Sequence, residues 1–266
     1  MPRERIIAVG ANGSGKTYGW LQLARHLPQK QFFVLDTDLT VDRSLPEFPD
    51  VVASGNVKGV PTVDWADYQA ALKEALVATR EGDWIVVDSI TRSWSAVRRY
   101  FSTEIFGKDM GAYFLEARKN LNAQKKSFGK SGGIFDGWKD WPVINRLYED
   151  FIYPLVFRTK ANLYFTAEPT SVGEDDSTDT RDLFGPYGVR PGGQKSLGHQ
   201  VDTVLLLAHR KTGWVMTTMK DRGGRAYTDH LSLVDLYLQY GKVAGWLNAE
   251  DKKAYLELMK RLRSVE

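Results

Sequence analysis

The chain has 266 residues, and its 36 Lys and Arg against 33 Asp and Glu leave a net charge of +3. That length fits one α/β domain with insertions, and the charge is too small to indicate nucleic acid by itself. Cysteine is absent, which excludes disulfide frameworks and thiolate metal sites. No apolar run reaches membrane-spanning length, and no secretory signal opens the chain. We therefore expect a soluble, cytoplasmic protein without a membrane partner.

Short apolar segments alternate with helical patterns along the chain, which is typical of an α/β fold. The expected strands are 6–9, 32–35, 84–87, 163–165, 204–207 and 214–217. The first expected helix follows the glycine loop and ends at residue 27, and the second covers 65–82. Further helices are expected to begin at residue 90, at an Asp140 cap (ending at 158) and at residue 248. Segments 45–61 and 169–198 are expected to be loops. This alternation predicts a mostly parallel sheet with helices on both faces. Ligands of such sheets bind at the carboxyl ends of the strands.

A glycine loop follows the first strand and matches the pattern G-x-x-x-x-G-K-[ST] in full. Its residues are Gly10, Ala11, Asn12, Gly13, Ser14, Gly15, Lys16 and Thr17. The strand before it and the amphipathic helix after it are the context that the pattern requires, whereas a bare glycine turn is the alternative. Backbone N–H groups and the helix start would bind a triphosphate. We expect Lys16 at the β- and γ-phosphates of ATP and the Thr17 hydroxyl on Mg²⁺.

Carboxylates stand at the ends of three other expected strands. Asp88 ends the third strand, as the second magnesium-site residue should. Many P-loop ATPases carry a glutamate directly after this aspartate, but Ser89 stands here. Asp36 and Asp38, after the second strand, are the nearest candidates for the base that prepares the water. Glu168, just past the fourth strand, is a candidate for sensing the γ-phosphate or orienting water. A cap or a solvated loop residue is the alternative for each.

Four short motifs resemble RecA-type proteins. Residues 86–89, VVDS, are similar to the RecA strand of that sequence, and residues 35–38, LDTD, resemble its IDAE strand end. The latter likeness places Asp38 where the family has its catalytic glutamate, with a reach shorter by one methylene. Residues 197–205, LGHQVDTVL, resemble LEHMVDTVL of the RadA branch, and residues 220–224, KDRGG, resemble its KNRFG. The small size is similar to phage ATPases of the Sak type, which are linked to single-strand annealing.

The resemblance implies a RecA-like P-loop NTPase core over 1–228, with an insertion at about 107–140 and the long loop 169–198, and a C-terminal helical tail over 229–266. It also implies an ATPase, stimulated by DNA, that assembles as a homo-oligomer with ATP bound between subunits. Lys220 and Arg222 would then act in trans on the γ-phosphate of a neighbouring subunit. A basic surface turn is the alternative for these two residues.

Two basic segments are candidates for contact with single-stranded DNA. In the insertion, Lys125, Lys126 and Lys130 are interleaved with Phe128, so cations could follow the backbone while rings stack on bases. In the second half of the long loop, Arg190 and Lys195 are further candidates; its first half is acidic. The alternative is that the rings anchor the core and the lysines form a solvated rim.

The sequence therefore predicts an ATP-dependent, single-stranded-DNA-binding recombination or annealing protein. We expect it in a bacterial or phage-infected cell, and a single-strand-binding protein is a further candidate partner. A hexameric translocase or helicase built on the same core is one alternative. A nucleotide-switched protein scaffold that does not bind DNA is another.

Overall fold

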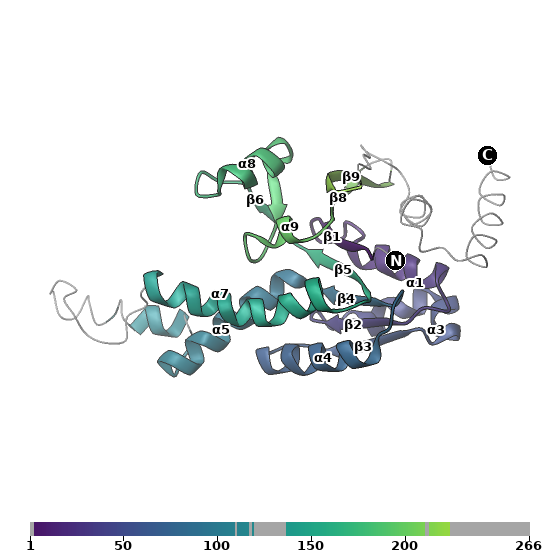
Figure 1. Cartoon of the computed structure of the whole chain (residues 1–266), viewed down its shortest axis with the longest axis horizontal. Coiled ribbons are helices and arrows are strands. Elements are labelled where there is room, and N and C mark those ends of the chain that lie inside the picture. The colour runs from purple at the N-terminus through teal and green to yellow at the C-terminus, as the bar shows by residue number, and fades with distance from the viewer. Residues whose placement is uncertain (1–2, 110, 117–118, 120–136, 211–212, 224–266) are drawn as a thin grey trace.

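The computed structural model describes residues 3–109, 111–116, 119, 137–210 and 213–223 (Figure 1). The predictions for Lys125, Lys126, Phe128 and Lys130, and for the tail 229–266, lie outside the described residues. None of the helices in the described ranges is long and apolar enough to cross a membrane.

A seven-stranded sheet runs through the molecule in the order β3-β2-β4-β5-β1-β8-β9. Its strands are β1 (Arg5–Val9), β2 (Phe32–Asp36), β3 (Val57–Pro61), β4 (Trp84–Asp88), β5 (Asn162–Ala167), β8 (Thr203–Arg210) and β9 (Gly213–Asp221). Neighbouring strands are parallel except β8 and β9, which form an antiparallel hairpin at one edge. Strand β5 lies between β1, which leads into the glycine loop, and β4, which ends at Asp88.

Helices cover both faces of the sheet because its strands are apolar on both faces. They are α1 (Lys16–His26), α2 (Val41–Ser44), α3 (Pro49–Ser54), α4 (Trp65–Ala78), α5 (Ile90–Phe106) and α7 (Gly137–Tyr153), with the 3-10 helix η1 (Leu45–Glu47) and the π-helix η2 (Pro154–Arg158). Alternate strand residues point to opposite faces. Ile7, Phe33 and Ile85 pack with residues of α4, α5 and α7, whereas Ile6, Phe32 and Trp84 pack with residues of α1 and α3. The expected α/β fold, a mostly parallel sheet with helices on both faces, is confirmed.

Segment 45–61 is not the loop that its prolines suggested. It contains η1, α3 and the edge strand β3, which pairs with β2. Each proline stands where it is tolerated. Pro49 is the first residue of α3, where its missing N–H would have no helical partner. Pro61 is the last residue of a strand at the sheet edge.

Segment 169–198 also carries regular structure. It contains β6 (Pro169–Ser171), α8 (Thr178–Phe184), η3 (Gly185–Tyr187), β7 (Val189–Pro191) and the start of α9 (Leu197–Gln200). Strands β6 and β7 form a separate antiparallel pair. The Ser177 hydroxyl caps α8 by accepting a hydrogen bond from the Thr180 N–H, and the Phe184 side chain is 1% exposed. In Figure 1 this unit projects from the main sheet beside β5 and β8.

Two helix ends differ from expectation. Helix α7 begins at Gly137 rather than at an Asp140 cap, so Pro142 lies inside it. Helix α4 ends at Ala78, and Gly82, expected as its closing residue, lies in the turn before β4 with a positive φ of 87°. Helices α5 and α7 pack on each other and run together away from the sheet (Figure 1).

Candidate functional site

The glycine loop between β1 and α1 needs glycine at three of its positions. Gly13 and Gly15 have φ of 77° and 91°, which L side chains rarely adopt. A Cβ on Gly10 would lie 2.5 Å from the backbone oxygen of Leu207. Gly15 directly precedes α1, so the first N–H groups of that helix have no intrahelical acceptor and can bind an anion.

Lys16 and Thr17 open α1 and point to the loop and to β4. The Lys16 ammonium donates to the backbone oxygens of Gly10 at 2.7 Å and Ala11 at 2.9 Å, so it lies over the loop. Burial lowers the pKa of Lys16, while the carboxylates of Asp88, Glu168 and Asp38 act in the opposite direction. The charges of three of the predicted acidic residues therefore act on the predicted phosphate-binding lysine.

Asp88 is the centre of a buried hydrogen-bond network. Its side chain is 3% exposed. Its carboxylate accepts hydrogen bonds from the Thr17 hydroxyl at 2.7 Å, from the Trp20 indole at 3.0 Å and from the Thr166 hydroxyl of β5. The predicted pair of Thr17 and Asp88 is thus brought together, and Thr166 and Trp20 orient the carboxylate.

The two candidate bases after β2 have different surroundings. Asp36 lies opposite Asp88 in the sheet, but its carboxylate accepts from the backbone N–H groups of Thr40 and Val41 and so holds the start of α2. Asp38 lines the same cavity as Lys16, Thr17 and Asp88. Of the two, only Asp38 is available to a bound ligand.

Asp38 forms an ion pair with Arg92 of α5. Burial raises the pKa of Asp38, Arg92 opposes that rise, and Asp88 and Glu168 add to it. A carboxylate with a raised pKa is a better proton acceptor than an ordinary one. The sequence reading missed Arg92. Arg92 lies four residues after Asp88, in the first turn of α5, and this position could have indicated a residue of the site.

Glu168 follows β5 directly, and its side chain is exposed. Its backbone N–H donates to the Thr91 hydroxyl at 3.0 Å, which ties the end of β5 to the start of α5. Its charge acts on both Lys16 and Asp38. Its predicted role at the γ-phosphate or the attacking water stays a prediction.

Several features fit a triphosphate on this loop. The hydroxyls of Ser14 and Ser89 are buried and have no hydrogen-bond partner within the part of the chain that the structure describes. A cavity of about 580 Å³ opens here, a size usual for small-molecule sites. It is lined by Asn12, Gly13, Gly15, Lys16, Thr17, Tyr18, Leu21, Asp38, Thr40, Ser44, Glu47, Asp88 and Trp214.

The two predicted trans-acting cations are held within their own chain. The Lys220 ammonium donates to the backbone oxygens of Gly198, His199 and Val201 at 2.7–3.0 Å. Burial, with Arg222 nearby, lowers the pKa of Lys220 to about 8. Arg222 bonds to Asp202 at 3.2 Å and to the backbone oxygen of His199 at 3.1 Å, and its side chain is 53% exposed. Lys220 thus caps the end of α9, and Arg222 is the one of the two with an exposed side chain.

Of the two predicted DNA contacts in segment 169–198, Arg190 is buried and Lys195 is exposed. Arg190 is 7% exposed and pairs with Asp176 at 3.1 Å. Lys195 also pairs with Asp176, at 3.2 Å, but its side chain is 55% exposed. Burial alone would raise the pKa of Asp176, but the Gly173 amide, Arg190 and Lys195 lower it to about 2. Arg190 is therefore buried in the β6–β7 unit, which does not favour the predicted DNA contact.

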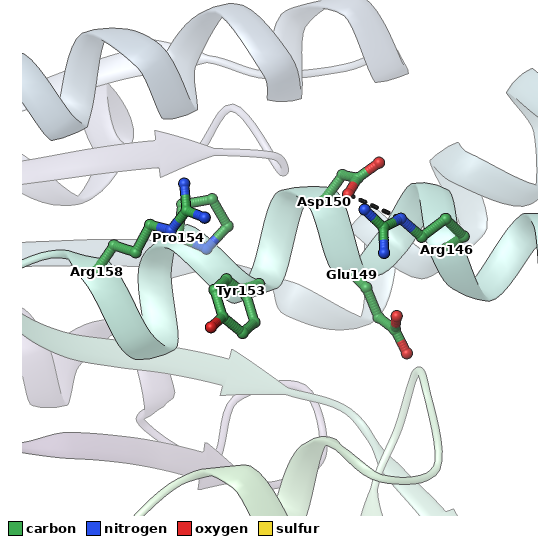
Figure 2. A pocket seen from close by; sticks show the side chains of 6 residues that line it. All are labelled: Arg146, Glu149, Asp150, Tyr153, Pro154 and Arg158. Atoms are coloured by element: carbon green, nitrogen blue, oxygen red, sulfur yellow. Dashed lines mark ion pairs between the residues drawn. The ribbon is translucent and has the colours of Figure 1, made fainter.

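A second hollow lies along α7 and η2, away from these residues. It is lined by Arg146, Glu149, Asp150, Tyr153, Pro154 and Arg158, and Arg146 pairs with Asp150 one helical turn away (Figure 2). The Arg158 guanidinium lies over the Tyr153 ring. None of the predicted site residues lines it, so the cavity at the glycine loop remains the candidate site.

The mostly parallel sheet, the glycine loop between β1 and α1 and the carboxylate at the end of β4 together define a P-loop α/β domain. No protein-family model and no curated protein matches the chain. Among solved structures it is similar to the crystal structure of the RadB recombinase, with a TM-score of 0.44 and 15% identity over 82% of this chain and 81% of that one. At this similarity the likeness does not say what the chain binds or does.

Proposed function

We propose that the chain is a RecA-like ATPase that binds Mg-ATP at its glycine loop and works on single-stranded DNA in recombination or annealing. One observation carries the nucleotide part of the proposal. Lys16, the Thr17 hydroxyl and the Asp88 carboxylate, from segments more than 70 residues apart, meet around one cavity. The RecA-like motifs support the DNA part.

The proposed role of each residue follows from its position in the site. Lys16 and the N–H groups of the loop hold the β- and γ-phosphates. Thr17 and Asp88 would hold Mg²⁺, which neutralises phosphate charge when it is bound. Asp38, positioned by Arg92, accepts the proton of the attacking water. Glu168 orients that water or contacts the γ-phosphate, so hydrolysis would depend on the geometry at the end of β5.

Replacing Lys16 by Ala tests the nucleotide site. We expect a loss of turnover of about 100-fold or more, because the variant loses the cation that lies over the loop. Steady-state ATPase rates, with and without single-stranded DNA, measure it. Lys30→Ala, a lysine beyond the end of α1, is the control. Normal turnover in Lys16→Ala would refute the site.

The DNA part rests on the sequence of the insertion, and it has its own test. Lys125, Lys126 and Lys130 replaced together by Ala should weaken binding of a labelled single strand. These substitutions should also reduce the slope of the logarithm of the binding constant against the logarithm of salt concentration by about 2, since each lost cation accounts for about 0.7. Fluorescence anisotropy against salt concentration reads both quantities. A triple variant of exposed basic residues elsewhere, Lys73, Arg80 and Lys160, is the control, and equal behaviour of the two variants would remove the insertion from the DNA path.

The oligomer part of the proposal concerns Arg222 more than Lys220. Arg222 is half exposed and bonds to the Asp202 carboxylate and to the backbone oxygen of His199, so a neighbouring phosphate would have to replace two contacts. Lys220 would have to leave three backbone acceptors. We propose Arg222 as the residue that reaches across to the ATP of a neighbouring subunit, with Lys220 supporting the end of α9 beneath it.

A further inference from the structure

The cavity at the glycine loop has an aromatic wall. Tyr18 lies on α1, directly after Thr17, and Trp214 lies at the start of β9. Their rings are nearly parallel, with 7° between the planes and 6.5 Å between the centroids. Both line the same cavity as Lys16. Two segments almost 200 residues apart in the chain thus place aligned rings beside the loop.

Both rings have further contacts within the protein. The Trp214 indole donates to the backbone oxygen of Gly13 at 3.1 Å, and its ring contacts His209 at 4.9 Å. The Tyr18 ring contacts Phe48 at 4.8 Å. These contacts fix the rings in place. Because the rings are already oriented, a ligand that stacks on them pays little further entropy of ordering.

The rings nevertheless remain largely open to solvent. Tyr18 is 45% exposed and Trp214 is 52% exposed. Aligned rings that line a cavity and are about half exposed leave aromatic surface accessible to a ligand. Their surroundings are mixed: Leu21 adds apolar surface, and Thr40 and Ser44 bring hydroxyls to the same cavity.

The cavity connects this wall with the phosphate-binding residues. A triphosphate held by the loop and Lys16 would leave its nucleoside within the same open cavity of about 580 Å³. The flat face of a base is the part of a nucleotide that stacks on aromatic rings. Hydroxyls and the Glu47 carboxylate, which also line the cavity, suit the polar edge of a base and ribose hydroxyls.

We propose that Tyr18 and Trp214 form the base subsite, on which the nucleobase of a nucleoside triphosphate stacks. This inference rests on the proposed function, because it needs the triphosphate to bind at the loop. It makes the β8–β9 hairpin part of the nucleotide site through Trp214. It also gives Tyr18 a role in the affinity for the nucleotide, in addition to its packing in α1.

The test compares two ligands, ATP and inorganic tripolyphosphate, which has the phosphates but no base. Affinities come from calorimetry with the full chain and Mg²⁺. Trp214→Ala and Tyr18→Ala should each weaken ATP binding by about 10- to 100-fold, the range that loss of one stacking partner gives. Tripolyphosphate binding should not change. Trp214→Phe and Tyr18→Phe, which keep a ring, should retain most of the ATP affinity.

A third aromatic residue provides the control. Tyr153 is 51% exposed and lies on α7, away from the cavity, so Tyr153→Ala should bind ATP like the unaltered chain. Unchanged ATP affinity in both alanine variants would overturn the inference. An equal loss for ATP and tripolyphosphate in Trp214→Ala would also overturn it, because the indole would then act only through Gly13. If the unaltered chain binds neither ligand, the proposed function itself fails.

Discussion

At the scale of single residues, Arg92 and Asp38 form the part of the site most open to a kinetic test. Asp38 has a pKa that burial raises and that Arg92 holds down. Arg92→Ala should raise this pKa further, so the acid limb of the ATPase rate against pH should move to higher pH. Rates of turnover from pH 5 to 9 measure the shift. Arg92→Lys keeps the charge and should restore the limb, and an unmoved limb in Arg92→Ala would exclude Asp38 as the base.

His26 gives a prediction for stability. Burial, together with the charge of Arg25, lowers the pKa of His26 to about 4, whereas an unfolded chain has a His pKa of about 6.5. Between these values the unfolded state binds a proton that the folded state does not. Stability should therefore be unaffected above about pH 6.5 and fall as the pH drops toward 4, by roughly 2–3 kcal/mol for this residue.

Urea unfolding at pH 7.5 and 4.5 measures the effect of His26. The unaltered chain should lose this part of its unfolding free energy at the lower pH, and His26→Gln should lose less. His209→Gln, an exposed histidine of β8, serves as the control and should lose as much as the unaltered chain. The same drop in His26→Gln as in the control would show that other groups cause it.

At the scale of elements, the unit of β6, α8 and β7 depends on one buried ion pair. Asp176 is 3% exposed on its side chain and pairs with Arg190. Arg190→Ala would leave a buried carboxylate with only Lys195 and the Gly173 amide, and we expect a cost of about 3 kcal/mol, since removing one partner of a buried pair leaves an uncompensated charge.

Limited proteolysis measures the loss of stability within the unit of β6, α8 and β7. Cleavage between residues 169 and 198 should be faster in Arg190→Ala, while Arg181→Ala, an exposed arginine of α8, should behave like the unaltered chain. Affinity for single-stranded DNA should stay the same in Arg190→Ala wherever the fold persists. A loss of DNA affinity without faster cleavage would instead show that Arg190 contacts DNA.

The elements also show how far the sequence could predict this fold. The six expected strands were all found, because each is a short apolar run next to a turn and both faces of the sheet are buried. Strand β3 was missed because an edge strand needs little apolar character: Lys58 and Gly59 in its middle are exposed. Segment 169–198 was missed because its structure depends on long-range contacts, such as that between Tyr187 and the Thr218 carbonyl.

The site was predictable to the extent that its residues are adjacent to strands. The glycine loop, Asp88 and Asp38 follow β1, β4 and β2, and parallel strands bring such ends together. Thr166 and Trp214 could not be found in this way. Thr166 bonds to Asp88 because β5 happens to lie beside β4. Trp214 reaches Gly13 because the β8–β9 hairpin is adjacent to β1.

At the scale of the whole molecule, the shared-site proposal predicts complementation. Arg222→Ala and Lys16→Ala should each be nearly inactive alone. When they are mixed, some interfaces combine an intact loop with an intact arginine, so turnover should recover in part and depend on protein concentration. ATPase rates across mixing ratios measure this, and light scattering reports the assembly. No recovery at any ratio, with assembly intact, would place Arg222 outside the neighbour's site.

The position of β5 has a consequence for how the chain acquires its activity. Strand β1 pairs with β5 and β8, more than 150 residues later in the chain, and β4 reaches β1 only through β5. A nascent chain that has emerged as far as α5 therefore already contains the glycine loop and Asp88 but lacks β5, the strand that lies between β1 and β4 in the sheet. Long-range pairing of this kind is slow to form. Nucleotide should thus engage the chain only late in synthesis, and it would stabilise the final step of folding.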